Sequence, residues 1–275
     1  MTTPQAPSYC KTYADADYDL QRPADVAVIM PTVIRPTLQE ALRSVFGQAP
    51  ARRIQIVIGI DRPDGDVGLI ETICADRPAH CCVNVIYPGY STSMRYGGLH
   101  PAYDGGVLRC VLTYLANSPY VAYLDDDNWW ADNHLSSMLA AIKDHHWAYA
   151  LRWFVHPDTR RSICVDQWES VGPGRGVFAQ KFGGWVDPNC LMFDKLACHQ
   201  AIPWWTRPFP NDPTHGTADR QVFGFLNQHF RGRGTGEATV YYQLNAADLN
   251  HADRVQAIGA AVYAAAGVPD GIALR

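Results

Sequence analysis

The sequence is poor in charge and has no long apolar run. Charged residues make up 18% of its 275 residues, and the formal net charge is −4. Broad nucleic-acid binding needs a basic face, so this balance argues against nucleic acid as a partner. No apolar run approaches the ~20 residues of a membrane span, and residues 1–21 lack the apolar centre of a signal peptide. We therefore expect no transmembrane segment and a cytoplasmic location.

The chain also lacks Cys-x-x-Cys pairs, internal repeats and long linkers. Its eight cysteines include several inside apolar runs, such as Cys110-Val111-Leu112, so we expect reduced thiols and no zinc site. The glycine-rich stretch 172–176 does not match Gly-x-Gly-x-x-Gly. It is interpreted as a lid over a ligand or as an ordinary surface loop.

The whole sequence is 47% hydrophobic, enough to supply a core, and strand and helix patterns alternate along its first two-thirds. The predicted strands are 26–30, 54–60, 82–87 and 120–124, and the predicted helices are 37–48, 67–75 and 105–117. This order predicts a parallel sheet with right-handed crossovers.

The second part of the chain is predicted to be less regular. Strands are expected at 147–155, 162–165, 185–193 and 239–244, helices at 133–144 and 219–230, and a glycine-rich loop at 170–184. The first two of these strands are candidates for a hairpin. An alanine-rich helix over 255–266 is expected to pack on the domain or on a second copy, as in a homodimer.

Three consecutive carboxylates, Asp125, Asp126 and Asp127, follow the apolar run 121–124. Adjacent carboxylates repel one another. A divalent cation with oxygen ligands, itself carrying phosphate oxygens, relieves that repulsion. The pattern therefore predicts a metal-dependent site for a phosphorylated substrate. The alternative is a solvated acidic turn that caps the helix starting near Ala131.

Two other predicted strands also end in polar or turn-forming residues. Pro31 and Thr32 end the first strand, and Asp61 ends the second. Because ligands gather at the carboxyl ends of parallel strands, these residues and the aspartates are expected to share one site.

Taken in order, these motifs resemble the family 2 glycosyltransferases of GT-A fold. Pro-Thr-Val-Ile-Arg-Pro at 31–36 is similar to that family's Pro-Thr-x-Asn-Arg-Pro, with Ile34 in place of Asn. Leu-Asp-Asp-Asp-Asn-Trp-Trp at 124–130 is similar to its metal motif. Arg109 stands at the spacing of the family's arginine before that motif, followed by Cys110 where the family has Asn.

The resemblance continues to residue 244. The stretch 185–193 resembles the strand before the acceptor region, and Thr-Ala-Asp-Arg at 217–220 stands where the family has Glu-Asp, with Ala218 in place of Glu. The Gln-x-x-Arg-Trp motif of processive synthases is absent from the sequence, which favours transfer of a single sugar.

The resemblance implies an α/β protein of GT-A fold: one Rossmann-like domain with a mostly parallel central sheet flanked by helices. Residues 26–130 are then the nucleotide-sugar half and 131–250 a more irregular acceptor half. Residues 1–25 form an N-terminal extension, and 251–275 form a C-terminal helical tail.

The resemblance also implies roles for individual residues. Mn²⁺ or Mg²⁺ is expected at Asp127, with Asp125 and His251 as further ligands. Asp219 is the expected general base, with Asp187 in reserve. The donor is expected to contact a further set: Pro31, Thr32, Arg35, Asp61, Arg109, Asp125 and Asp126.

Purely structural roles are alternatives for several of these residues. Asp61 is also a candidate for a helix N-cap or a turn aspartate, and Asp219 for a helix N-cap. Arg35 is a candidate for a surface charge, Arg109 for a structural salt bridge, and His251 for an exposed loop histidine.

The implied activity is transfer of a sugar, with inversion, from a UDP-sugar to a hydroxyl of a glycan, lipid-linked or small-molecule acceptor. One alternative is a non-catalytic sugar-nucleotide or carbohydrate-binding protein of the same fold. Another is a nucleotidyltransferase, which requires a glycine-rich basic loop that 31–36 does not supply.

Overall fold

One mixed sheet runs through the part of the chain that the computed structural model describes, residues 8–49, 53–103, 105–212 and 215–268. Its strand order is β1-β4-β3-β2-β5-β11-β7-β12-β6, with β8 paired to β7, and β9 and β10 form a separate pair. The strands are β1 (Tyr9–Tyr13), β2 (Val26–Thr32), β3 (Ile54–Ile60), β4 (Cys81–Tyr87), β5 (Tyr120–Tyr123), β6 (Trp129–Trp130), β7 (Trp147–Val155), β8 (Ser162–Val165), β9 (Gly172–Pro173), β10 (Gly184–Trp185), β11 (Leu191–Asp194) and β12 (Gly232–Gln243).

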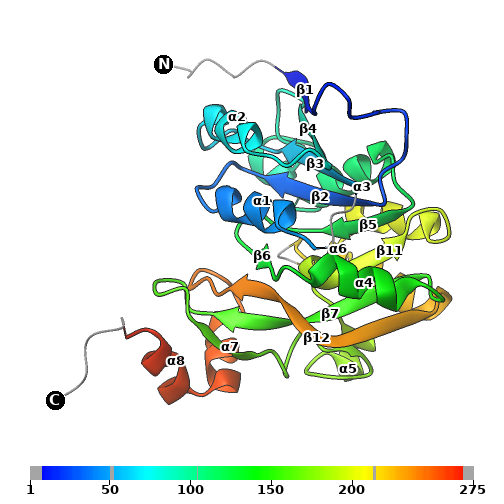
Figure 1. The fold of residues 1–275 in the computed structure, drawn as a ribbon. Helices are drawn as coiled ribbons and strands as arrows, with labels where there is room; N and C mark the ends of the chain where they lie inside the picture. The colour runs from blue at the N-terminus through cyan, green and yellow to red at the C-terminus, as the bar shows by residue number, and fades with distance from the viewer. Residues whose placement is uncertain (1–7, 50–52, 104, 213–214, 269–275) are drawn as a thin grey trace.

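Helices cover both faces of this sheet, with α1, α2 and α4 on one face and α3 on the other (Figure 1). The α-helices are α1 (Leu38–Phe46), α2 (Val67–Ala75), α3 (Gly106–Leu115), α4 (His134–Ile142), α5 (Ala179–Phe182), α6 (Ala218–His229), α7 (His251–Ile258) and α8 (Ala260–Ala266). The 3₁₀ helices are η1 (Met94–Tyr96), η2 (Pro188–Cys190) and η3 (His199–Thr206).

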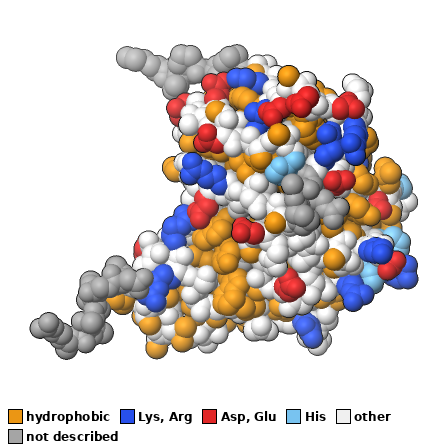
Figure 2. All heavy atoms as spheres, viewed as in Figure 1, with side chains coloured by type: hydrophobic (Ala, Val, Ile, Leu, Met, Phe, Trp, Pro, Cys, Tyr) orange, Lys and Arg blue, Asp and Glu red, His pale blue; other side chains and the backbone are white. Residues whose placement is uncertain are grey.

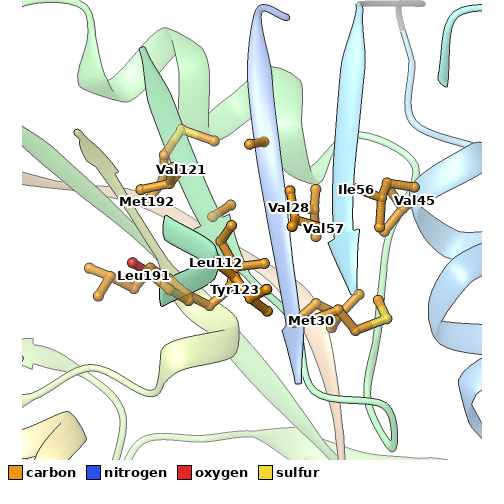
Figure 3. Close-up of a cluster of buried hydrophobic side chains, with 14 of the residues drawn as sticks. Val28, Met30, Val45, Ile56, Val57, Leu112, Val121, Tyr123, Leu191 and Met192 are labelled. Atoms are coloured by element: carbon orange, nitrogen blue, oxygen red, sulfur yellow. The ribbon is translucent and has the colours of Figure 1, made fainter. Parts of the chain in front are cut away.

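The core lies around β2, β3 and β5. Strands β4, β3, β2 and β5 are parallel, and β2 is an uninterrupted apolar run from Val26 to Met30, as expected for a strand buried on both faces. Helix α3 approaches β3 closely, because a Cβ on Gly59 would lie 2.7 Å from Leu112. Figure 3 shows Leu112 and Tyr123 among the side chains of this core. This packing fixes the strand ends that carry the polar residues.

The sheet continues across the predicted boundary between residues 130 and 131. Strand β11 lies antiparallel between β5 and β7, and β12 runs parallel to β7 and antiparallel to β6. The prediction of an α/β fold with a largely parallel central sheet flanked by helices is confirmed. The hairpin of β7 and β8 is confirmed as well, because the two strands pair antiparallel.

The single strand predicted at 185–193 is wrong. Asp187 interrupts it, because its carboxylate accepts a hydrogen bond from the backbone N–H of Asn189 at 2.9 Å and Pro188 occupies the first turn of η2. Two short strands, β10 and β11, therefore flank a 3₁₀ turn. The helix predicted at 255–266 is likewise divided into α7 and α8, at Gly259 with φ of 95°.

Both ends of the described chain pack on the sheet. In the predicted extension, β1 adds an antiparallel edge strand to β4. In the predicted tail, the Tyr263 ring lies 4.9 Å from the His156 ring, so α8 packs on the domain. Residues 1–7 and 269–275 of these two segments lie outside the described residues. Within the described ranges, every helix is too short or too polar to cross a bilayer.

Candidate active site

A cavity of about 1000 Å³ lies over the carboxyl ends of β2, β3 and β5. Further walls come from the segments before α6 and after β12. The predicted site residues that line it are Pro31, Thr32, Arg35, Asp61, Arg109, Asp125, Asp126, Asp127, Asp187 and Asp219. The sheet edge thus gathers side chains from distant parts of the sequence. On the face drawn in Figure 2, acidic side chains are interspersed with basic ones instead of forming one block.

Asp126 joins the aspartate turn to the loop after β2. Its side chain is 1% exposed. It accepts hydrogen bonds from the Thr32 hydroxyl at 2.5 Å and the Val33 N–H at 3.3 Å, and it is paired with Arg35. These contacts occupy both carboxylate oxygens, so Asp126, Thr32 and Arg35 hold the shape of the cavity floor.

The loop after β2 contains a strained residue. Ile34 is buried and has φ of 62°, in the left-handed region that a β-branched residue adopts at a cost. The family 2 glycosyltransferases, which the sequence resembles, have Asn at this position, and Asn tolerates that conformation. The Ile34 N–H donates to the Thr32 hydroxyl at 2.7 Å, and this bond with burial holds the strained turn in place. Pro31 supports the same loop by packing against Gly105 at the start of α3.

Asp125 is held from two sides. It forms a salt bridge with the largely buried Arg109 of α3, and the Asn189 amide donates to its Oδ2 at 3.0 Å. The Asp125 N–H in turn donates to Asn189 Oδ1 at 2.6 Å. The structural salt bridge considered for Arg109 is therefore present. It leaves the Asp125 carboxylate in the cavity wall with a fixed orientation.

Asp127 is the least compensated of the three aspartates. Its side chain is 37% exposed, and the nearest Arg35 nitrogen is 3.7 Å away. The Asn128 amide donates to Oδ1 at 3.0 Å. Burial, followed by the charges of Asp125 and Asp126, raises the pKa of Asp127 to about 7. A carboxylate in this state gains strongly from a nearby cation.

These residues fit a divalent cation that shares its coordination with a ligand. In the described part of the chain, no cluster of three or more His, Cys, Asp or Glu side chains is arranged to hold a metal alone. Mg²⁺ commonly binds one or two carboxylates and completes its shell with substrate phosphates and water. Asp127 and Asp125 match that pattern.

His251 does not line the cavity. It begins α7 and its ring lies against Tyr263, with centroids 5.8 Å apart. Asp248 from the same segment lines the cavity instead, and its charge acts on Asp127. The structure thus does not bring His251 to the aspartates.

Asp61 anchors the loop after β4. Ser91 donates to its Oδ2 at 2.8 Å, and the Thr92 N–H donates to its Oδ1 at 3.1 Å. The cap of α2 is instead Asp66, whose carboxylate accepts from the Gly68 N–H at 2.8 Å. The alternative of a helix cap for Asp61 is therefore wrong, and Asp61 lies buried in the cavity wall.

Asp187 belongs to a buried ionic network centred on Arg152. The Arg152 side chain is 0% exposed and contacts Asp166 at 2.9 Å, Glu169 at 2.5 Å and Asp187 at 2.6 Å. Burial alone raises the pKa of Asp166 and Glu169, but further contacts outweigh it and hold both pKa values below their usual range: the Arg152 charge with backbone N–H donors for Asp166, and the Arg152 and Arg254 charges for Glu169. For Asp187, burial prevails over Arg152 and the pKa is raised.

The network extends to the C-terminal wall of the cavity. Glu169 also accepts from Arg254 of α7 at 2.8 Å, and Arg254 donates to Asp248 at 2.8 Å. Asp187 accepts from the Asn189 amide at 2.7 Å, and that amide also reaches Asp125. One chain of contacts therefore runs from α7 to the aspartate turn.

Asp219 lies in the first turn of α6 and faces the cavity. Its Oδ1 accepts from the Arg220 N–H at 2.7 Å. The N-cap residue of α6 is Thr217, which makes no side-chain cap bond. Asp219 is not the N-cap residue, but its carboxylate does satisfy an N–H of the first turn. The Arg220 guanidinium lies 5.0 Å from the Trp185 ring and 4.9 Å from the Phe178 ring, which fixes its position beside Asp219.

Two residues of the site, Asn189 and Asp248, were not identified from the sequence. Asn189 lies in the stretch 185–193, which the sequence pattern predicts as one strand. The pair Asp187-Pro188 directly before Asn189 is a turn signal, and it could have shown that the strand is interrupted there. Asp248 follows β12 without any motif, and its place in the wall depends on the ion pair with Arg254.

We predict that Arg152→Met lowers the free energy of unfolding by about 3–5 kcal/mol, because the buried Asp166 and Asp187 lose their cation and Glu169 keeps only Arg254. The wild-type pKa values of Asp166 and Glu169 are lowered, so their stabilising effect is present at neutral pH and lost as pH falls through the acid range. The difference in free energy of unfolding between wild type and variant should therefore be largest near neutral pH and shrink toward pH 4. Urea unfolding measured over this range checks both points.

Arg233→Met is the matched control, because Arg233 is exposed at the start of β12. Its cost is expected within about 0.5 kcal/mol. An Arg152→Met protein as stable as this control would show that the network does not support the fold.

Comparison with known proteins gives matches among solved structures. A structure of S. aureus TarS 1-349 matches with a TM-score of 0.56 at 17% identity, covering 88% of this chain and 71% of that one. The same fragment in complex with UDP-GlcNAc matches at 16% identity over 82% of this chain and 60% of that one, also with a TM-score of 0.56.

A mannosyltransferase from Pyrobaculum calidifontis, PcManGT, in complex with GDP-Man and Mn²⁺, matches with a TM-score of 0.55 at 13% identity, covering 86% of this chain and 61% of that one. A longer TarS structure is covered over 42% of its length. No protein-family profile and no curated protein sequence matches the chain. At these identities the matches establish the architecture, and the chain has the GT-A fold of the glycosyltransferases to which it is structurally similar.

Proposed function

We propose that the protein transfers a single sugar from a nucleotide-sugar donor to an acceptor hydroxyl, with a divalent cation at Asp127. The observation that carries this proposal is the geometry of the aspartate turn: three consecutive carboxylates at a strand end line the cavity, and Asp127 is the most exposed of them. Partial burial and the charges of Asp125 and Asp126 raise the pKa of Asp127 to about 7, in keeping with that arrangement. The glycosyltransferases of similar fold, among them structures with UDP-GlcNAc and with GDP-Man and Mn²⁺, support it.

The donor is proposed to lie with its base near Asp61 and its diphosphate near the aspartate turn. A carboxylate at a strand end is suited to accept the imide hydrogen of uracil, which favours UDP as the nucleotide. The cavity also holds Arg35 and Arg95, whose positive charges complement a diphosphate. Residues 26–130 then form the donor half and 131–250 the acceptor half.

Asp127 would hold Mn²⁺ or Mg²⁺, with Asp125 beside it, and the bound cation would neutralise the charge that develops on the departing diphosphate. The chain itself supplies orientation. Arg109 and Asn189 fix the Asp125 carboxylate, and Arg35 fixes Asp126. A site whose polar groups are already in place needs little rearrangement during the reaction.

Asp219 is proposed as the general base. It removes the proton of the acceptor hydroxyl, and the acceptor oxygen forms a new bond to the anomeric carbon. The bond from that carbon to the diphosphate breaks, and the electron pair leaves with UDP. Attack opposite the leaving group inverts the anomeric carbon. Asp187 is less suited to this role, because it is buried and belongs to the ionic network of Arg152.

We predict that UDP raises the melting temperature in the presence of Mn²⁺, more than GDP or dTDP does. A ligand at about 100 times its Kd stabilises the native state by about 2.7 kcal/mol. Asp127→Ala should abolish the Mn²⁺-dependent part of the shift, whereas Asp144→Ala, a change at an exposed aspartate, should retain it. The absence of a shift with every nucleotide would refute the proposed donor site.

We predict that Mn²⁺ affinity depends on pH through Asp127. Because its pKa is raised to about 7, the carboxyl group must release a proton to bind the metal at lower pH. Affinity should rise about tenfold per pH unit below pH 7 and level off above it. Electron paramagnetic resonance of free Mn²⁺, measured at a saturating concentration of UDP-sugar, checks this. Asp127→Asn should bind weakly at every pH, and a wild-type affinity independent of pH would contradict the prediction.

We predict that Asp219→Asn lowers kcat by about 10²–10⁴-fold, the usual contribution of a general base. Binding of UDP and Mn²⁺ should be unchanged. The rate is measured as hydrolysis of the UDP-sugar found to bind, which also separates an enzyme from a binding protein. Asp187→Asn should instead lower stability. Full activity in Asp219→Asn, together with loss of activity in a folded Asp187→Asn protein, would reverse the assignment.

A further inference from the structure

A second groove, of about 500 Å³, runs along α6 beside the main cavity. Lys181, Phe182 and Arg220 line both hollows, so the groove and the cavity adjoin at these residues. Asp219 stands at the same end of α6, next to Arg220. A ligand in the groove therefore has one end close to the candidate general base.

Aromatic rings form much of the groove surface. The Phe182 and Phe209 rings are stacked, with centroids 5.4 Å apart and planes at 9°. The Trp204 and Phe225 rings lie 5.5 Å apart at 30°. All four line the groove and are partly exposed. Flat apolar faces of this kind bind the C–H faces of sugar rings.

Polar groups in the groove are amides and cations. Gln221, Asn227 and Gln228 lie along α6 and can bond to hydroxyl groups. The Lys181 ammonium lies 5.0 Å from the centre of the Phe182 ring. The described residues that line the groove include no aspartate or glutamate. Of the two cations, Arg220 is paired with Asp219 at 3.4 Å, so the exposed Lys181 carries the positive charge of the groove.

The groove is open at Gly224 in the middle of α6. A Cβ at this position would meet no atom within 4 Å, although glycine weakens a helix interior. The face from Arg220 to His229 is about 14 Å long at 1.5 Å per residue, longer than one sugar ring. The free space over Gly224 thus allows an extended ligand to lie along the helix.

We propose that this groove binds the acceptor as an anionic oligosaccharide, whose sugar rings contact the aromatic surface and whose carboxylate or phosphate groups contact Lys181. The terminal hydroxyl then reaches Asp219. This inference rests on the proposed transferase function, but it concerns the acceptor and not the donor.

The first test fills the groove without touching the donor cavity. Gly224→Trp places a ring in the open space, and Gly224→Ala is the control that improves the helix without filling the groove. Calorimetry with tetragalacturonate and with a phosphorylated maltotetraose, in the presence of UDP and Mn²⁺, should show binding to wild type and Gly224→Ala. Gly224→Trp should bind neither oligosaccharide yet bind UDP and Mn²⁺ normally.

The second test concerns charge. Neutral maltotetraose should bind about tenfold more weakly than the better of the two anionic oligosaccharides, a difference of about 1.4 kcal/mol. Lys181→Gln should reduce that preference, whereas Lys143→Gln, at an exposed lysine after α4, should not. The tighter of the two anionic ligands identifies carboxylate or phosphate as the recognised group.

Equal binding of neutral and anionic oligosaccharides would overturn the anionic class, and unchanged binding by Gly224→Trp would overturn the location. A protein that binds UDP and Mn²⁺ but none of the three oligosaccharides would overturn the inference while leaving the donor site intact. A wild-type protein that does not bind UDP would instead count against the proposed function itself.

Discussion

The candidate site depends on one buried cation, Arg152. Removing a guanidinium and three carboxylates from water is costly, and such groups are often no more stabilising than apolar residues of the same volume. Here the ion pairs join separate segments: β7 carries Arg152, the loop after β8 carries Asp166 and Glu169, and Asp187 caps the turn η2. Through Glu169 the same network holds Arg254 and the C-terminal wall. Substitution of Arg152 would therefore displace two walls of the cavity together. Apolar residues in its place would pack the backbone but would not orient any carboxylate.

Features that depend on local sequence could be predicted closely. The bounds of β3, α2, β7 and β8 agree with the sequence patterns, because each has a clear apolar period and ends at turn-forming residues. The convergence of Pro31, Asp61 and the three aspartates was predictable as well, since the parallel order of the strands places their carboxyl ends at one edge. Nothing in that reasoning required knowledge of the partner of any side chain.

Features that depend on partners could not be predicted in the same way. Asp187 ends a strand pattern because it caps a turn and binds Arg152, and neither contact has a sequence signature. Whether His251 or Asp248 faces the aspartates depends on how α7 docks, and the docking is set by Arg254 and Glu169. Ile34 illustrates the same limit in the backbone: its left-handed conformation is unfavourable locally, and burial in the folded chain maintains it.

Burial and the pairing of charges together explain why the pKa of Asp127 is raised. Arg35 and Thr32 compensate Asp126, and Arg109 and Asn189 compensate Asp125. The partners that neutralise these two carboxylates also keep them in place, and their remaining charge acts on Asp127. The nearest Arg35 nitrogen lies 3.7 Å from the Asp127 carboxylate, and Arg35 is paired mainly with Asp126. A cation brought by a ligand would therefore relieve more repulsion at Asp127 than at Asp125 or Asp126. The fixed ion pairs therefore determine where a metal and its phosphates gain most, and they do so before any ligand arrives.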